Sequence, residues 1–264
     1  MSIPDFTTVC GVDHKHLEQL LTVWPTWKRH KPGLLEQPML IFFDHGQLTS
    51  HQVRSAIDHP DLLAVGWPPL DVVYEGNPDD KWTHPRRYMM LAGFVYVAAY
   101  LVTTPYWLKL DTDVVATGND NWIDPSWFVD DPAIISHPWS FTKPPDQILQ
   151  LDKWVDGGGE KLAELKNYPA LNLVPKPGSD RVGHRRIISW CAFFNTGFTK
   201  MCATMAATTC GSYKLPVPSQ DGFMFYVAKR MEKNIIRTSM KKRGWQQWLT
   251  MGNIQRSAKE ALEV

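Results

Sequence analysis

The sequence predicts a single-domain α/β protein in which a mostly parallel central sheet carries helices on both faces. Two observations support this fold class. Strand-like and helix-like segments alternate through the first half of the chain, and most of the strand-like segments are continuous apolar runs. Such runs are typical of strands buried on both faces, and β-α-β alternation places these strands in one parallel sheet. The chain of 264 residues is long enough for one large domain of this kind.

The first half is expected to contain four strands separated by helices. The strands are expected at residues 6–12, 38–43, 62–66 and 106–110. The helices between them are expected at residues 16–30, 49–57 and 85–102. In the first of these helices apolar residues recur at helical spacing, and the last begins with Pro85, a residue favoured at helix starts.

The second half has a less regular pattern. Further strands are expected at 133–136 and 186–195. Further helices are expected at 144–168, with an interruption at three glycines, and at 196–208 and 219–232. Ser219 is a suitable N-cap for the last of them. The segment 169–184 is rich in proline and glycine and is expected to be a loop.

One stretch, residues 88–108, carries no charge and is long enough to span a bilayer. It contains three tyrosines before Thr103-Thr104-Pro105, a sequence that stops a helix. We therefore expect a buried helix followed by a buried strand, and no membrane span.

The composition is that of a globular protein with balanced charge. Hydrophobic residues make up 44% and charged residues 21% of the chain, which excludes a disordered or collagen-like protein. The net charge of +1 gives no overall attraction to nucleic acid or anionic membranes. The four cysteines show neither zinc-site spacing nor a disulfide-rich pattern, and the first residues do not resemble a secretory signal. We therefore expect a cytoplasmic protein with reduced thiols.

Two carboxylates, Asp111 and Asp113, directly follow the apolar run at 106–110. Ligands of open α/β sheets bind beyond the carboxyl ends of the strands. If the chain turns after Asp111, both side chains can face one crevice and share a hard divalent cation. Such a cation neutralises a diphosphate leaving group. The alternative interpretation is a pair of loop-capping aspartates.

Other nucleotide and metal motifs are absent from the sequence. It contains no G-x-x-x-x-G-K-[ST] loop, no G-x-G-x-x-G and no H-E-x-x-H. His14 and His16 could bind a metal, but such a pair is more typical of a solvated helix start.

Four segments in order resemble the nucleotide-sugar glycosyltransferases of the GT-A fold. Within that fold they are most similar to the retaining family that includes glycogenin and the bacterial lipopolysaccharide galactosyltransferases. The segments are VCGVD at 9–13, RRY at 86–88 with LKLDTD at 108–113, FFNTGF at 193–198, and SQDGF at 219–223. The resemblance implies transfer of a hexose from a nucleotide-diphosphate sugar, with UDP as the expected nucleotide, to an acceptor hydroxyl. It also implies a nucleotide-binding half at about 1–115 and an acceptor-binding half at about 116–264.

The resemblance assigns a metal site and a nucleoside site. Asp111 and Asp113 of the D-x-D motif would hold Mn²⁺ or Mg²⁺. Val12 and Asp13 would lie beside the nucleoside, and Thr112 would lie near the ribose.

The remaining implied residues surround the diphosphate and the reacting carbon. Arg87 would contact the diphosphate or sugar hydroxyls, and Asn195 and Gly197 would border the donor sugar. Gln220 and Asp221 would stand at the anomeric carbon or the acceptor hydroxyl. Several also have a structural interpretation: Arg87 as a helix cap, Asn195 as a turn residue before a helix, and Asp221 as a charge in the first turn of a helix.

The sequence departs from the family pattern in two places. The family supplies a third metal ligand from a histidine near the C-terminus, whereas no histidine follows His184 here. Asn253 or water could take that place. Ser219 stands where the family has the first aspartate of its D-Q-D segment, and inverting enzymes also carry a base at this helix start. Retention and inversion therefore both stay open.

The acceptor is indicated only by general features. Basic residues gather at Arg181–Arg186 and at Lys241–Arg243, which indicates either a solvated face or an anionic acceptor. The twelve tryptophans fit sugars and bases alike. A glycan, a lipid-linked acceptor, another hydroxyl compound and modified DNA are all compatible with these features.

Two other functions fit the same residues. Asp-Thr-Asp after an apolar strand also resembles the nucleophile motif of haloacid-dehalogenase-like phosphatases, with Asp111 as nucleophile and Asp113 as acid/base. That motif normally stands on the first strand of its chain, whereas about a hundred residues precede it here. A non-catalytic binding protein that keeps the GT-A fold is the third reading.

Overall fold

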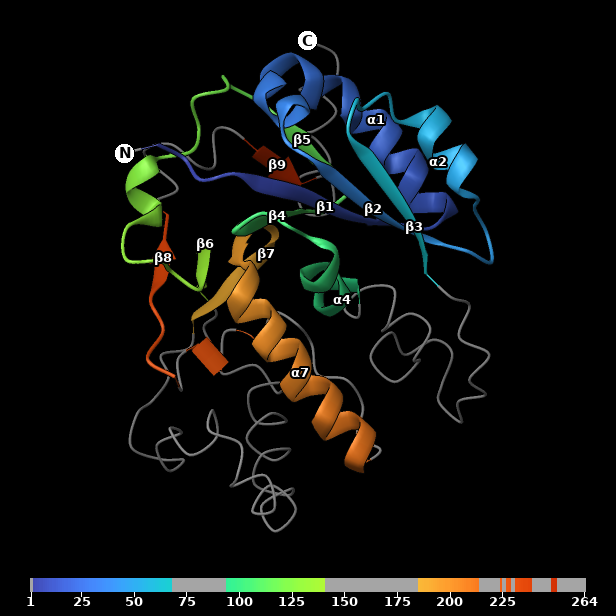
Figure 1. Cartoon of the computed structure of the whole chain (residues 1–264). Helices are drawn as coiled ribbons and strands as arrows, with labels where there is room; N and C mark the ends of the chain where they lie inside the picture. Colours follow the sequence, from blue (N-terminus) through green and yellow to red (C-terminus); the bar gives the residue numbers. More distant parts are fainter. Residues whose placement is uncertain are drawn as a thin grey trace.

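A computed structural model describes residues 2–67, 94–140, 185–213, 224, 227–228, 231–238 and 248–250. In this part of the chain seven strands form one sheet in the order β3-β2-β1-β4-β7-β6-β8, and β5 pairs separately with β9 (Figure 1). The strands are β1 (Phe6–Val12), β2 (Met39–Asp44), β3 (Leu62–Trp67), β4 (Tyr106–Leu110), β5 (Val114–Ala116), β6 (Ile134–Ser140), β7 (Arg185–Asn195), β8 (Ile235–Arg237) and β9 (Trp248–Thr250). The helices are α1 (His14–His30), α2 (Ser50–Ala56), α4 (Phe94–Leu101) and α7 (Thr196–Tyr213), with the 3-10 helices η1 (Pro32–Glu36) and η3 (Pro125–Phe128).

The sheet is mixed and mostly parallel, as the sequence predicts. Strand β1 pairs in parallel with both β2 and β4, and β2 pairs in parallel with β3. Strand β7 lies antiparallel to both β4 and β6, while β8 is parallel to β6. The alternating first half therefore builds the parallel part, and the antiparallel β7 joins it to the second half.

Helices cover both faces of the sheet. Successive residues of one strand therefore contact different helices, because their side chains point to opposite sides of the sheet. Leu108 of β4 lies in a buried cluster with apolar residues of α1 and α2. Its neighbour Trp107 lies in a second cluster with residues of α4 and α7, and its ring stacks on Phe194 with centroids 4.7 Å apart. The two clusters are the two halves of the core on either side of β4.

Glycine is required near the end of β1. A Cβ atom at Gly11 would lie only 2.7 Å from Cε1 of Phe94, the first residue of α4. The missing side chain therefore lets α4 pack directly on the central strand, two residues before Asp13.

Most predicted elements of the described chain are present, with altered ends. Helix α1 begins at His14, and Asp13 is its N-cap. Helix α7 continues to Tyr213, beyond the predicted end at 208. The short sheet of β5 and β9 was not predicted. The segment 144–184 and most of the predicted helix 219–232 lie outside the described residues. Within those residues, no helix is both long enough and apolar enough to cross a membrane.

Candidate functional site

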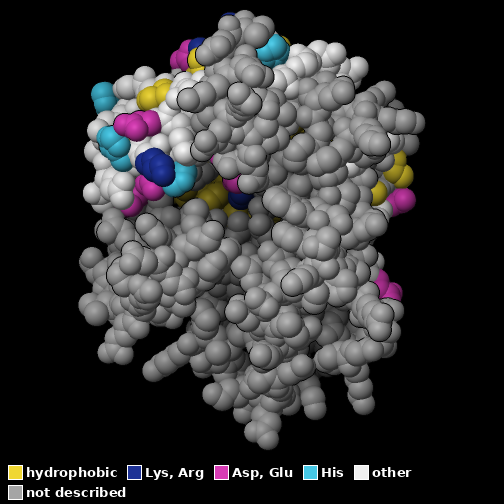
Figure 2. Space-filling view, turned by 180° about the vertical axis from the view of Figure 1, so that it is seen from behind, with side chains coloured by type: hydrophobic (Ala, Val, Ile, Leu, Met, Phe, Trp, Pro, Cys, Tyr) yellow, Lys and Arg dark blue, Asp and Glu magenta, His cyan; other side chains and the backbone are white. Residues whose placement is uncertain are grey.

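Three strands end together at the carboxyl edge of the sheet. Val12, the last residue of β1, pairs with Phe43 of β2, and Val9 of β1 pairs with Lys109 of β4. The residues that follow these strands, Asp13 and Asp111 among them, therefore lie along the same edge. The back of the molecule is hollowed, and hydrophobic, acidic and basic side chains are visible in the hollow (Figure 2).

Asp111 is the first polar side chain beyond β4. Its side chain is 42% exposed and pairs through Oδ1 with Nζ of Lys109, whose side chain is only 4% exposed. Side chains two residues apart on an extended chain lie on the same face, which explains why these two meet. Asp111 thus lies between a buried ammonium group and solvent.

The chain turns after Asp111, so that the second carboxylate follows closely. The amide of Val114 donates to the carbonyl oxygen of Asp111 at 3.3 Å. Thr112 is buried, and its Oγ1 lies 3.5 Å from Oε1 of Gln19 in α1. Asp113 is half-buried. The turn therefore buries Thr112, while Asp111 and Asp113 on either side of it are only partly buried.

Helix α1 holds the segment that follows Asp113. Nε1 of Trp27 donates to the carbonyl oxygen of Val114 at 2.6 Å, and Oγ1 of Thr26 accepts from the amide of Ala116 at 3.0 Å. One turn later, Nζ of Lys31 donates to the carbonyl oxygen of Thr117 at 2.7 Å. Strand β5 is thus fixed against the helix that begins at Asp13.

The carboxylates Asp111 and Asp113 fit a hard divalent cation. Both supply oxygen atoms, the donor type that Mg²⁺ and Mn²⁺ prefer. No group of three or more His, Cys, Asp and Glu side chains suited to a metal occurs among the described residues. A site with two carboxylates is what Mg²⁺ typically uses when water and substrate phosphates complete its coordination.

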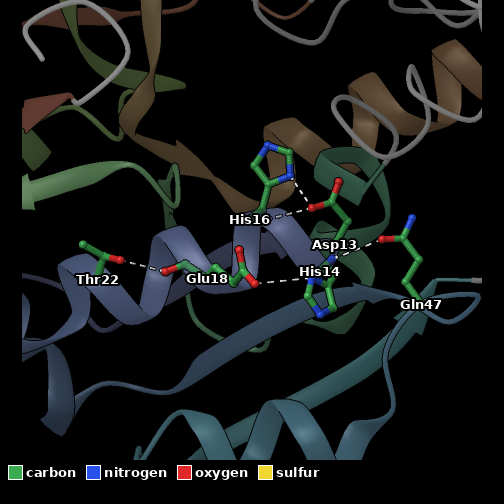
Figure 3. A network of polar contacts seen from close by, with 6 residues as sticks. All are labelled: Asp13, His14, His16, Glu18, Thr22 and Gln47. Carbon is green, nitrogen blue, oxygen red and sulfur yellow. Dashed lines mark hydrogen bonds and ion pairs between the residues drawn. The ribbon is translucent and has the colours of Figure 1, made fainter.

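Asp13 lies at the start of α1 within a network of polar contacts (Figure 3). Its Oδ1 accepts from the backbone amide of His16 at 2.8 Å and lies 2.7 Å from Nδ1 of the same histidine. Oε1 of Gln47, in the loop after β2, accepts from the amide of His14 at 3.2 Å. The predicted nucleoside contact Asp13 is therefore also the cap of a helix, held at the same edge as Asp111.

Val12, the residue expected beside the nucleoside with Asp13, is the last residue of β1. Its side chain is fully buried in the core. Any contact of Val12 with a substrate is therefore limited to its backbone.

Asn195 and Gly197 lie at the opposite edge of the sheet. Because β7 is antiparallel to β4, Asn195 pairs with Tyr106, the first residue of β4, while Cys191 pairs with Leu110. Five residues of strand separate Tyr106 from Asp111, which corresponds to about 16 Å. The structure does not bring Asn195 and Gly197 to the carboxylate pair.

The side chain of Asn195 has structural partners for both of its polar atoms. Its Oδ1 accepts from the amide of Phe198 at 2.9 Å and so caps α7, and its Nδ2 donates to Oδ1 of Asp131 at 2.8 Å. The hydroxyl of Tyr106 donates to the same Asp131 oxygen at 2.7 Å. Burial raises the pKa of Tyr106, and this hydrogen bond raises it further. The interpretation of Asn195 as a turn residue before a helix matches these contacts.

Other predicted site residues cannot be placed. Arg87, Gln220 and Asp221 lie outside the described residues, as do the basic residues 241–243 and Asn253. Their roles stay predictions. Of the tryptophans considered for the acceptor, Trp122 is buried and stacks on Phe193 with centroids 5.8 Å apart, so it belongs to the core.

One residue of the edge, Lys109, was missed from the sequence, and His16 was considered only as a possible metal ligand with His14. Lys109 stands inside an apolar strand, and that lone charge was the available signal. His16 follows Asp13 by three residues, the spacing that lets a side chain near a helix start return to the cap.

The comparisons with known proteins identify the fold. No family model and no curated protein sequence matches the chain. Among solved structures, it is similar to core-mannan synthase A from Aspergillus fumigatus in its Mn/GDP form, with a TM-score of 0.58 and 12% identity over 88% of this chain and 71% of that one. It is also similar to the galactosyltransferase LgtC in complex with donor and acceptor sugar analogs, with a TM-score of 0.52 and 12% identity over 89% and 74%. The mannosyltransferase Ktr4p from S. cerevisiae with GDP matches with a TM-score of 0.51 and 11% identity over 84% and 63%.

These likenesses define the class of the fold. The chain has the GT-A fold found in nucleotide-sugar glycosyltransferases, and the expected likeness to the lipopolysaccharide galactosyltransferases is confirmed at the level of the fold.

Proposed function

We propose that the protein is a divalent-metal-dependent glycosyltransferase that moves a hexose from a nucleotide-diphosphate sugar to an acceptor hydroxyl. The observation that carries the proposal is the position of Asp111 and Asp113. The Asp111 side chain is 42% exposed and Asp113 is half-buried, and both directly follow β4 at the edge of the sheet where Asp13 follows β1. In open α/β sheets this edge is where ligands bind.

The described residues have distinct roles in this proposal. Asp111 and Asp113 would hold Mn²⁺ or Mg²⁺, which neutralises the diphosphate as it leaves. Asp13 would accept hydrogen bonds from the nucleoside while its Oδ1 caps α1. Thr112, the residue expected near the ribose, is buried between the two aspartates in the turn.

The reacting carbon depends on residues that the sequence alone suggests. We propose Arg87 for the diphosphate or the sugar hydroxyls, and Gln220 and Asp221 for the anomeric carbon or the acceptor hydroxyl. An aspartate beside a helix N-terminus stays ionised, so it can orient a hydroxyl group or remove its proton. UDP is the expected nucleotide from the sequence. The Mn/GDP form of core-mannan synthase A makes GDP a second nucleotide to test.

The test is a screen of nucleotide-sugars for donor hydrolysis, read by mass spectrometry. The purified protein is incubated with UDP- and GDP-sugars in the presence of Mn²⁺, and in parallel with EDTA. We expect release of UDP or GDP from at least one donor, and loss of that release with EDTA.

Two results would contradict the proposal in different ways. A burst of phosphate from an aryl phosphate, with no turnover of any nucleotide-sugar, would indicate the phosphatase chemistry of an Asp111 nucleophile. Metal-dependent nucleotide binding without turnover, with or without acceptor sugars, would indicate a non-catalytic binding protein.

A further inference from the structure

Two lysines in the described part of the chain are almost completely buried. Lys31 is 0% and Lys109 is 3% exposed. A buried ammonium group is costly unless it is paired and hydrogen-bonded, so the partner of each lysine indicates its use.

Lys31 has a structural use. Its Nζ donates to the backbone carbonyls of Thr117 and Asn119 and lies 5.6 Å from the ring centroid of Trp248. These contacts hold the loop after β5 against the end of α1, and burial lowers the pKa of Lys31 to about 8.

Lys109 has a different kind of partner. It pairs with Asp111, a carboxylate at the candidate metal site whose side chain is 42% exposed. The backbone of Lys109 is fixed in the middle of the sheet, because it pairs with Val9 of β1 on one side and with Ala192 of β7 on the other. The ammonium group therefore stays behind the carboxylate and does not reach the solvent side of the site.

Among the described residues, Lys109 is a buried positive charge that pairs with one of the two carboxylates. Cys10 of β1 and Cys191 of β7 lie on the two strands that pair with β4. The charges of Asp111 and Lys109 both act on the pKa of these thiols. Burial raises the pKa of both thiols, and Asp111 raises it further, so they stay neutral and add no charge. The pair with Lys109 therefore offsets the negative charge of one of the two aspartates.

We propose that Lys109 couples the metal to the nucleotide: it weakens binding of a divalent cation alone and strengthens binding of the nucleoside diphosphate that accompanies it. This inference rests on the proposed function. Lys109 acts through Asp111 and through its charge, so it is a positioning residue rather than a catalytic one.

The signs follow from Coulomb's law. A buried positive charge repels a cation held by Asp111 and attracts the negative diphosphate, and low solvent exposure leaves both effects weakly screened. The cation then binds well only when the diphosphate contributes its own charge. Because coupling is reciprocal, the cation raises the affinity for the nucleotide by the same factor.

The experiment measures the two binding steps separately by calorimetry. Mn²⁺ alone is titrated into the wild-type protein and into Lys109→Met, and UDP and GDP are then titrated at saturating Mn²⁺. In Lys109→Met we expect Mn²⁺ alone to bind at least about fivefold more tightly, and the nucleotide to bind at least about fivefold more weakly. Lys109→Arg keeps the charge and should resemble the wild-type protein.

Two further variants separate charge from folding and from hydrogen bonding. Lys109→Gln removes the charge but keeps a donor for Asp111, so it should show the same opposite shifts and serves where Lys109→Met does not fold. Lys28→Met removes an ammonium group from another ion pair, with Asp58 at 2.9 Å, and should leave both affinities within twofold.

The possible failures are distinguishable. If both affinities fall together in Lys109→Met and Lys109→Gln, or if neither changes, the coupling role is refuted while the proposed function stands. If the wild-type protein binds neither UDP nor GDP with Mn²⁺, the proposed function fails and this inference fails with it.

Discussion

At one end of strand β4, Asp111 keeps 42% of its side chain exposed and Asp113 is half-buried. At the other end, Tyr106 and Asn195 both donate to one oxygen of Asp131, and the carbonyl of the Asn195 side chain caps α7. Both ends are rich in polar side chains. Asp131 is itself exposed, so exposure does not distinguish the two ends, and only the first end lies at the edge where ligands of open α/β sheets bind.

The difference separates polar groups that hold the fold from those available to a ligand. A side chain whose donor and acceptor are already paired inside the protein would have to break those contacts to bind a substrate, and each break costs free energy. Asp111 also has a partner, Lys109, but 42% of the Asp111 side chain stays exposed beside that contact. Four predictions test this contrast and the packing around it.

The largest effect is expected from the same chemical change made at both ends. Asp113→Asn removes one metal-binding charge, so we expect nucleotide affinity at saturating Mn²⁺ to fall by about 100-fold or more, which is about 2.7 kcal/mol. Asp131→Asn is the control, because asparagine tolerates the positive φ of 46° at this position. Calorimetry with UDP and GDP should show the control within twofold of the wild-type protein. Equal losses of nucleotide affinity in both variants would show that the two ends of β4 do not differ in nucleotide binding.

Substitution of two glycines by alanine is expected to change the stability of the protein by different amounts. Gly11→Ala would place a Cβ 2.7 Å from the ring of Phe94, so we expect a loss of about 1–3 kcal/mol in the free energy of unfolding. At Gly197, in the first turn of α7, the nearest atom to a Cβ is Oδ1 of Asn195 at 3.3 Å, and alanine favours a helix. We expect Gly197→Ala to change stability by less than about 0.5 kcal/mol. Urea denaturation measures both; a neutral Gly11→Ala would show that α4 adjusts freely.

The two N-caps offer a matched pair. Asp13→Ala and Asn195→Ala each remove the side chain that caps a helix, α1 or α7, so each should lower stability by about 1 kcal/mol. Only Asp13 lies at the carboxyl edge, and so only Asp13→Ala should also weaken binding of UDP or GDP. Thermal denaturation and calorimetry on the same samples separate the two effects. Weaker nucleotide binding in Asn195→Ala would indicate that Asn195 contributes to the donor site.

The last prediction concerns how the contribution of Lys31 to stability depends on pH. Its pKa is about 8 in the folded protein and close to 10.5 when unfolded, so between these values the unfolded chain binds more protons. The contribution of Lys31 to the free energy of unfolding therefore rises with pH from 8 to 10, by about 1 kcal/mol per pH unit. The stability difference between the wild-type protein and Lys31→Met should grow accordingly, because the other titrating groups are shared. A constant difference would show that Lys31 titrates normally.

Part of this architecture could be predicted from the sequence. The apolar run ending at Leu110 and the two aspartates after it are adjacent in the chain, so their place at the edge of a buried strand follows from local pattern. The first strand and the cap Asp13 are equally local, since helix α1 begins directly after them.

The placement of Asn195 could not be predicted in the same way. The residues around it predict a strand followed by a helix, and the structure confirms both. The direction of that strand relative to β4 is a tertiary property, and an antiparallel pairing carries the end of β7 to the start of β4. Lys109 and Asp111 are only two residues apart, so their pairing could have been predicted from the sequence. The burial of Lys109 could not, because it depends on the neighbouring strands β1 and β7, which lie far away in the sequence.

The contacts of α1 with the chain after Asp113 have a consequence for how the edge responds to change. Trp27 holds Val114 from a position about 20 Å along the helix from Asp13. One rigid helix therefore sets the spacing between the capped end, where the nucleoside is expected, and the turn that presents Asp113. Substitutions in the last turns of α1, such as Trp27→Phe, should alter metal affinity from a distance, without any contact with the ion or the sugar.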